Sequence, residues 1–155
     1  MKTALVKRFR RLLGTWRGPA GLESGHGGII QMHFAQLFEG RLVQLDASIC
    51  DPETGETLSA GAGLFAMGED GLLVEGLYAK RIGFSLMHET RDEPEVIAMT
   101  GELARGMSMN VSFRLEDGEL MLTSQVKSSA VGMASPRTVA RLKRMERDPL
   151  VRGDE

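Results

Sequence analysis

Apolar and polar residues alternate most regularly between positions 107 and 115. The odd positions are apolar throughout, and the even positions from Ser108 to Arg114 are polar. A period of two is typical of a β-strand with one buried and one solvated face. Similar strand-like composition recurs along the chain and predicts further strands over 29–38, 41–50, 57–67, 72–80, 83–90, 95–104, 120–126 and 137–145.

Sequences that favour turns separate these segments. Asp51–Gly55 combines a proline, which presets one dihedral angle, with a glycine, which accepts a positive φ. About ten short strands at spacings of roughly 8–12 residues are typical of a sandwich or a barrel. No long helical segment lies between them, so antiparallel pairing is favoured. Because closure removes exposed strand edges, the sequence predicts an all-β, about ten-stranded antiparallel up-and-down β-barrel.

The first residues show a helical pattern. Leu5, Phe9, Leu12 and Leu13 fall at helical spacing among lysines and arginines. We predict one domain over 1–155, with a short helix over about 3–13 that plugs one barrel end, a barrel over about 14–145 and a polar tail over 146–155. The alternative is a basic amphipathic helix for an acidic membrane surface. No apolar run approaches the roughly 18 residues of a spanning helix, so no integral membrane segment is predicted.

Charge and cysteine content narrow the class of protein. The net charge is −2, which argues against a nucleic-acid partner. The single cysteine, Cys50, excludes an internal disulfide and fits a reducing compartment, so we expect a cytoplasmic protein. The three histidines, His26, His33 and His88, match no zinc motif. No nucleophile–base set or phosphate loop stands out, so no metal site or catalytic residue is predicted, and an enzymatic activity is left open.

A Gly-x-Trp-x-Gly motif occurs at Gly14–Gly18, a turn with a proline and a glycine begins at Asp51, and a basic segment lies at Ala140–Arg144. These three segments resemble the nitrobindin family of haem-binding, fatty-acid-binding-protein-like barrels, which belong to the lipocalin-like calycins. Leu13–Gly18 resembles that family's opening Gly-x-Trp-x-Gly strand, and Asp51–Leu58, followed by Ala60, Gly63 and Leu64, resembles its turn and following strand. Ala130–Gly132, Pro136 and Ala140–Arg144 resemble its closing hairpin. The resemblance covers about residues 12–144 and implies the barrel fold.

The resemblance also implies which residues have changed. The family's haem-ligating histidine opens the last strand, where this chain has Arg137, or Thr138 if the register shifts by one. Neither is an ordinary haem ligand. We therefore expect a divergent member that has lost haem binding by the usual route. The family also implies that Trp16 closes one barrel end under an arginine of the last strand, either Arg141 or Arg144, in a cation–π contact.

Ten methionines suggest a deformable interior, although a loosely specified core explains them equally well. The residues predicted to reach a ligand cavity are Met32, Phe34, Tyr78, Met87, His88, Met109, Phe113 and Arg137. Polar residues that could reach it from one strand or another are Glu75, Tyr78, Ser85, Glu89, Glu102, Ser112, Thr123 and Gln125.

The leading functional prediction is a barrel that binds a small hydrophobic or amphipathic ligand, such as a lipid or fatty acid. An inward Arg or Lys would hold its acid group, while the Met and Phe faces hold the tail. No cofactor is predicted in this case. A second hypothesis is haem or tetrapyrrole binding through Tyr78, Met87 or His88. A third is a self-filled barrel that acts as an interaction module or homodimer.

Overall fold

Ten strands and one short helix make up the computed structural model, which describes residues 3–22, 27–80, 82–90, 93, 95–103, 106–128 and 137–145. The elements are α1 (Ala4–Phe9), β1 (Gly14–Leu22), β2 (Gly28–Leu37), the 3-10 turn η1 (Phe38–Gly40), β3 (Leu42–Cys50), β4 (Thr57–Met67), β5 (Leu73–Ala79), β6 (Gly83–Glu89), β7 (Val96–Glu102), β8 (Met107–Glu116), β9 (Glu119–Ser128) and β10 (Arg137–Arg144).

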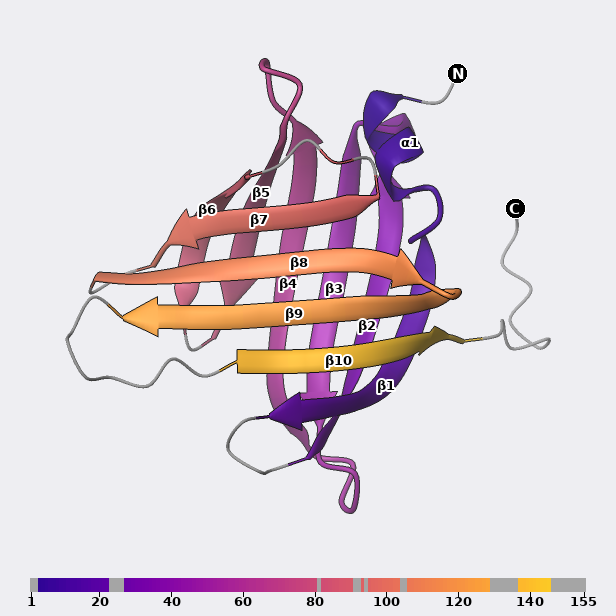
Figure 1. Ribbon diagram of the computed structural model, residues 1–155, viewed down its shortest axis with the longest axis vertical. Coiled ribbons are helices and arrows are strands. Elements are labelled where there is room, and N and C mark those ends of the chain that lie inside the picture. The colour runs from indigo at the N-terminus through magenta and orange to yellow at the C-terminus, as the bar shows by residue number, and fades with distance from the viewer. Residues whose placement is uncertain are drawn as a thin grey trace.

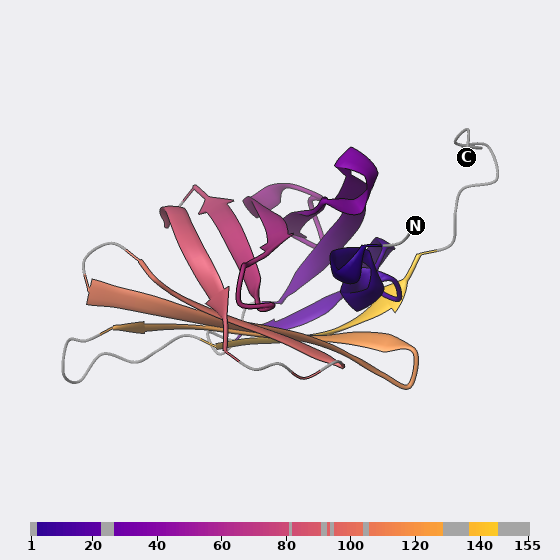
Figure 2. The same ribbon diagram turned by 90° about the horizontal axis from the view of Figure 1, so that it is seen from above.

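Each strand pairs antiparallel with its neighbours in sequence, and β1 also pairs with β10, so the sheet closes into a barrel. In Figure 1, β7–β10 cross in front of β3–β5 at a steep angle, and Figure 2 shows these two walls from above with α1 at one end. The predicted ten-stranded antiparallel up-and-down barrel with a short N-terminal helix is therefore confirmed.

Alternation along each strand decides which residues enter the barrel. On β2, for example, Ile30, Met32 and Phe34 are buried, whereas Gln31 and His33 between them are exposed. Phe38, the last residue of the predicted strand 29–38, is 73% exposed. The strand ends at Leu37, and Phe38 enters η1 with a positive φ, so the alternation no longer sets its direction.

Helix α1 covers one end of the barrel, as the plug interpretation predicted. Leu5, Val6 and Phe9 are buried against the strands, and the Thr3 side chain caps the helix by accepting a hydrogen bond from the amide of Val6. The apolar face is therefore occupied inside the protein and is not available to a membrane surface. The described helices include none that is long and apolar enough to cross a membrane.

The helix is shorter than the predicted 3–13, since it ends at Phe9. The amides of Leu12 and Leu13 both donate to the Phe9 carbonyl, which closes the last turn. Gly14 then adopts a φ of +116°, a value that favours glycine, and turns the chain into β1. The apolar residues at 12 and 13 follow the helix instead of extending it.

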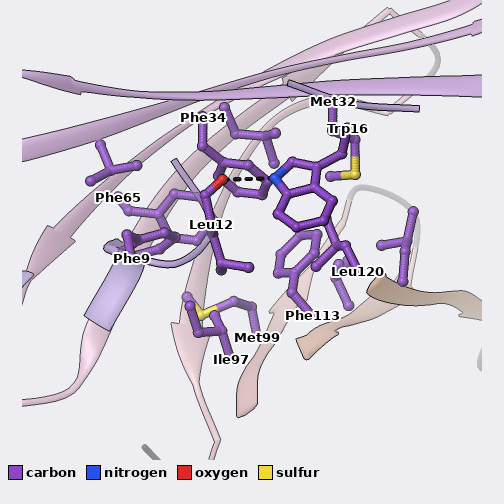
Figure 3. Packing of buried hydrophobic residues seen from close by; sticks show 14 of the residues in the cluster. Phe9, Leu12, Trp16, Met32, Phe34, Phe65, Ile97, Met99, Phe113 and Leu120 are labelled. Atoms are coloured by element: carbon purple, nitrogen blue, oxygen red, sulfur yellow. Dashed lines mark hydrogen bonds between the residues drawn. The ribbon is translucent and has the colours of Figure 1, made fainter. Parts of the chain in front are cut away.

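Four phenylalanines fill the barrel beside α1. Phe9 lies 4.8 Å from Phe65 and 6.1 Å from Phe34 between ring centroids, and Phe113 meets Phe34 edge-on at 5.8 Å. Figure 3 shows these rings with Trp16, whose indole nitrogen donates a 2.8 Å hydrogen bond to the Leu12 carbonyl. Tilted and edge-on aromatic pairs are favourable arrangements, so this half of the interior is densely packed.

An ion pair ties the helix to the opposite wall. The two terminal guanidinium nitrogens of Arg8 donate hydrogen bonds to the Glu89 carboxylate, at 3.0 and 2.6 Å. The amide of Leu73 donates a third hydrogen bond to the same carboxylate at 3.1 Å. Because the Glu89 side chain is fully buried, this bidentate pair supplies the charge partner that a buried carboxylate requires.

Trp16 is buried under a cation at the same end of the barrel. The guanidinium carbon of Arg144 lies 4.3 Å from the Trp16 ring centroid, and its nitrogens donate to the carbonyls of Leu13 and Arg11. Arg141, the other candidate, lies 3.8 Å from carboxylate oxygens of Glu116 and of Glu119. The two arginines differ because residue 141 points away from the barrel on β10, whereas residue 144 lies at its end.

Candidate functional site

A cavity of about 190 Å³ lies inside the half of the barrel away from α1. It begins beyond Met32 and Phe113, where the phenylalanine cluster ends, and is bounded mainly by β2–β5 and β8–β10. Its lining residues are Ile30, Met32, Leu45, Ala47, Ser48, Ile49, Ser59, Ala60, Gly61, Ala62, Gly63, Glu75, Leu77, Ala79, Ile82, Met109, Val111, Phe113, Leu122, Ser124 and Thr138.

Small residues create this space. Ala47, Gly61, Gly63 and Ala79 stand on neighbouring strands at positions that follow the inward alternation. On β4 the next inward position toward the helix is Phe65, which is fully buried in the packed half. The same strand therefore fills one half of the barrel with a ring and leaves the other half hollow.

Glu75 is the one ionisable residue among the described residues that line the cavity. It stands on β5 opposite Phe65 on one side and Met87 on the other, and it is only 2% exposed. Its carboxyl lies against Gly63, where an added Cβ would collide with Oε2. Glycine at 63 thus makes room for the carboxyl group inside the barrel wall.

No described residue forms an ion pair or hydrogen bond with the Glu75 carboxyl. Burial in apolar surroundings disfavours the charged form and raises the pKa of Glu75 to about 8. At neutral pH the Glu75 side chain is therefore mostly a neutral carboxylic acid, which both donates and accepts hydrogen bonds.

The lining does not suit the haem iron that the resemblance implied. Thr138, next to the expected ligand position, faces the cavity, whereas Arg137 is exposed. Among the described lining residues, only Met32 and Met109 belong to the side-chain types that ligate haem iron. Nor do the described residues contain a cluster of three or more His, Cys, Asp or Glu side chains that could hold a metal ion.

The predicted cavity residues divide into three groups: those that line the cavity, those that are packed in the core, and those on the outer face. Met32, Met109 and Phe113 line the cavity. Phe34 and Met87 face inward but are fully packed in the core, at 1% and 0% exposure.

Three predictions about cavity residues were wrong, because Tyr78, His88 and Arg137 lie on the outer face. Tyr78 is 53% exposed. Each of the three follows or precedes a residue that alternation places inside, so each must point outward.

Sequence reasoning also missed polar lining residues, namely Ser48, Ser59, Ser124 and Thr138. Of the eight polar residues proposed to reach the cavity, Glu75 alone lines it. The signal for two of the missed residues was present. Ser124 follows the buried Leu122 at a spacing of two, and Thr138 precedes the buried Ala140 at the same spacing. His26 and the segment 130–136 of the closing hairpin lie outside the described residues.

Fold and cavity together define a closed antiparallel barrel with a mainly apolar, partly open pocket on its inner face. The crystal structure of Rv2717c from M. tuberculosis is similar, with 17% identity over 94% of this chain and 100% of that chain and a TM-score of 0.74. A redesigned β-barrel, b11L5F_LGL, shares 15% identity over 94% and 100% of the two chains, with a TM-score of 0.52. These likenesses concern the fold alone. No family model and no curated protein matches the sequence.

Proposed function

We propose that this barrel binds a small, mainly apolar molecule in its internal cavity. The observation that carries the proposal is the cavity itself, about 190 Å³ with an apolar lining and one buried carboxyl group. Ligand sites typically combine apolar walls with a few polar groups that orient the ligand. Protein interiors otherwise pack to the density of organic crystals, so a pocket with this lining provides room that close packing would fill.

The cavity lining argues against the acid group that the leading prediction gave to its amphipathic ligand. Holding an acid group requires an inward Arg or Lys, and the described lining has neither. An engineered apolar cavity of roughly 150 Å³ accommodates benzene. The ligand is therefore expected to be about the size of one substituted ring or a short branched chain, rather than a long fatty acid.

A titration with 2-phenylethanol, followed by protein NMR, tests the proposal. We expect saturable shifts of amides around the cavity, and loss of binding in Ala47→Leu, which puts a larger side chain into the cavity from β3. Ala98→Leu is the matched control, because Ala98 lies between the inward residues Ile97 and Met99 of β7 and so points outward. Absence of saturable shifts in the unmodified protein, or equal binding by Ala47→Leu, would overturn the cavity as the binding site.

We also propose that the chain is a divergent relative of the nitrobindin-like barrels. Two features support this proposal: the order of the resembling segments along the chain, and the ten-stranded barrel. Since the described lining has no imidazole, hemin is expected to give no saturable, stoichiometric Soret band. A sharp band that His88→Ala abolishes would restore the haem hypothesis, despite the outward direction of that residue.

A second candidate function is self-association. Four large apolar side chains, Leu64, Tyr78, Phe84 and Leu86, are 44–76% exposed on the outer face of β4–β6. They are continuous in the sheet, because Tyr78 pairs with Phe84 and the Phe84 ring lies over Gly76. Exposed apolar clusters on small proteins mark interaction surfaces.

Sedimentation should then show a dimer that Phe84→Ser and Leu86→Ser dissociate. A monomer at all concentrations would exclude self-association.

A further inference from the structure

Glu75 is the only buried carboxyl group in the described part of the chain that lacks a partner of its own. Glu89, the next inward carboxylate across the β5–β6 pair, has Arg8 and the Leu73 amide. A buried charge without a partner is strongly unfavourable, and buried polar groups are generally hydrogen-bonded. The protein therefore places an acid without a described partner at the wall of a cavity large enough to bring a partner to it.

We propose that the cavity selects small apolar amines, bound as ammonium ions with the Glu75 carboxylate as their counter-ion. This inference rests on the proposed ligand-binding function and names its ligand class. An ammonium group supplies three hydrogen-bond donors and the opposite charge, which together satisfy a carboxylate. Charge-assisted hydrogen bonds are about twice as strong as those between neutral groups.

The rest of the lining favours a cation over an anion. Phe113 adds an aromatic ring, whose face attracts cations, while the hydroxyls of Ser124 and Thr138 can accept hydrogen bonds as well as donate them. A carboxylate ligand would instead bind beside Glu75 only while Glu75 keeps its proton, because two adjacent carboxylates repel each other. The described lining offers no basic group to offset that repulsion.

Binding is expected to strengthen with pH. The positions facing Glu75 from β4 and β6 are Phe65 and Met87, neither of which titrates, and Glu89 is held by Arg8. An ammonium ion needs the ionised carboxylate, so its binding releases the proton that burial retains on Glu75. With the pKa of Glu75 at about 8, amine affinity should rise roughly tenfold per pH unit below that value.

Calorimetric titration with three ligands of one shape tests the inference: 2-phenylethylamine, 2-phenylethanol and phenylacetate. At pH 8 we expect the amine to bind at least tenfold more tightly than the alcohol, and phenylacetate to show no binding. Glu75→Gln should abolish the preference for the amine, so that the amine and the alcohol bind this variant with similar affinity. Glu69→Gln removes the same charge from an exposed turn and serves as the control.

The possible failures are distinguishable. Equal binding of amine and alcohol, or an amine preference that survives in Glu75→Gln, would overturn the inference and leave the cavity as a site for neutral ligands. If none of the three probes binds the unmodified protein, the proposed function itself fails.

Discussion

Two buried carboxylates on neighbouring strands have opposite surroundings. Glu89 lies at the helix-covered end, where Arg8 and a backbone amide satisfy it, in a half of the barrel filled by aromatic rings. Glu75 lies in the hollow half, among small and apolar residues and without a partner from the described chain. The helix-covered end is tightly packed and its carboxylate is paired, whereas the other half contains a cavity and a carboxyl group without a described partner.

On the proposed function, this difference assigns folding to one half of the barrel and binding to the other. Tight packing and a complete ion pair hold the covered end in a single arrangement. The hollow half gives up contacts that its lining atoms would otherwise make, which costs stability. If the two halves serve different purposes, matched substitutions in them should have unequal effects.

The largest expected effect comes from breaking the ion pair. Arg8→Met leaves the fully buried Glu89 carboxylate without its charge partner, which should lower the free energy of unfolding by about 3–5 kcal/mol. Arg10→Met, at an exposed position just after the helix, should change it by less than about 0.5 kcal/mol. Urea denaturation measures both. Similar small effects of the two substitutions would show that the pair does not hold the helix.

The next effect concerns the pH dependence of stability. Burial raises the pKa of Glu75 from 4.5 to about 8, so between these values the folded state binds a proton that the unfolded state has released. The free energy of unfolding therefore falls as pH rises through this range. Glu75→Gln should remove that fall and raise stability at pH 8 by on the order of 2–4 kcal/mol.

Urea denaturation of Glu75→Gln and Glu69→Gln between pH 5 and 8 makes the comparison. Glu69→Gln should preserve the slope of the unmodified protein, because residue 69 lies exposed in the turn before β5. Parallel curves for all three proteins would mean that Glu75 titrates normally in the folded state.

Two leucines on β9 compare the packing of the halves directly. Leu120 is fully buried away from the cavity, whereas Leu122 lines it. Leu120→Ala should cost about 3–5 kcal/mol because it opens a new void in packed surroundings. Leu122→Ala should cost roughly 2 kcal/mol less, since some of its atoms already face empty space. Equal losses on chemical denaturation would indicate that the cavity is closed up in solution.

The smallest effect separates the two arginines of β10. Arg144→Met removes the cation over Trp16 and should cost about 0.5–2 kcal/mol. Among the described residues Arg141 makes only long, exposed ion pairs, so Arg141→Met should cost no more than about 0.5 kcal/mol. Thermal unfolding of the two variants ranks them, and the reverse order would assign the covering role to Arg141.

The fold could be predicted from the sequence because its signals are local. The alternation from Met107 to Leu115 and turns such as Asp51–Gly55 specify strands and hairpins from short stretches of chain. In the structure, Asp51 accepts hydrogen bonds from the amides of Glu53 and Thr54, which lowers the pKa of Asp51 and fixes the turn. Each of these features needs only its immediate neighbours.

The candidate site was harder to predict, because a cavity is made by strands far apart in the sequence. Alternation alone gives two choices of face for each strand, and Tyr78, His88 and Arg137 were assigned to the wrong one. Which face a residue occupies is decided by its neighbours that pack in or against the core. Leu77 does this beside Tyr78, and Met87 does it beside His88. Glu75 was among the polar candidates, but nothing local distinguished it from Glu89.

By itself, the sequence determined the number of strands, their antiparallel order and the helix at the start, because periodicity and turn chemistry act over a few residues. Only the tertiary structure decided where the interior is full and where it is hollow. It brought Arg8 to Glu89 across 81 positions and left Glu75 facing Gly63 and the cavity. The reason is physical: the partner of a buried charge and the volume beside it depend on residues that meet only when the barrel closes.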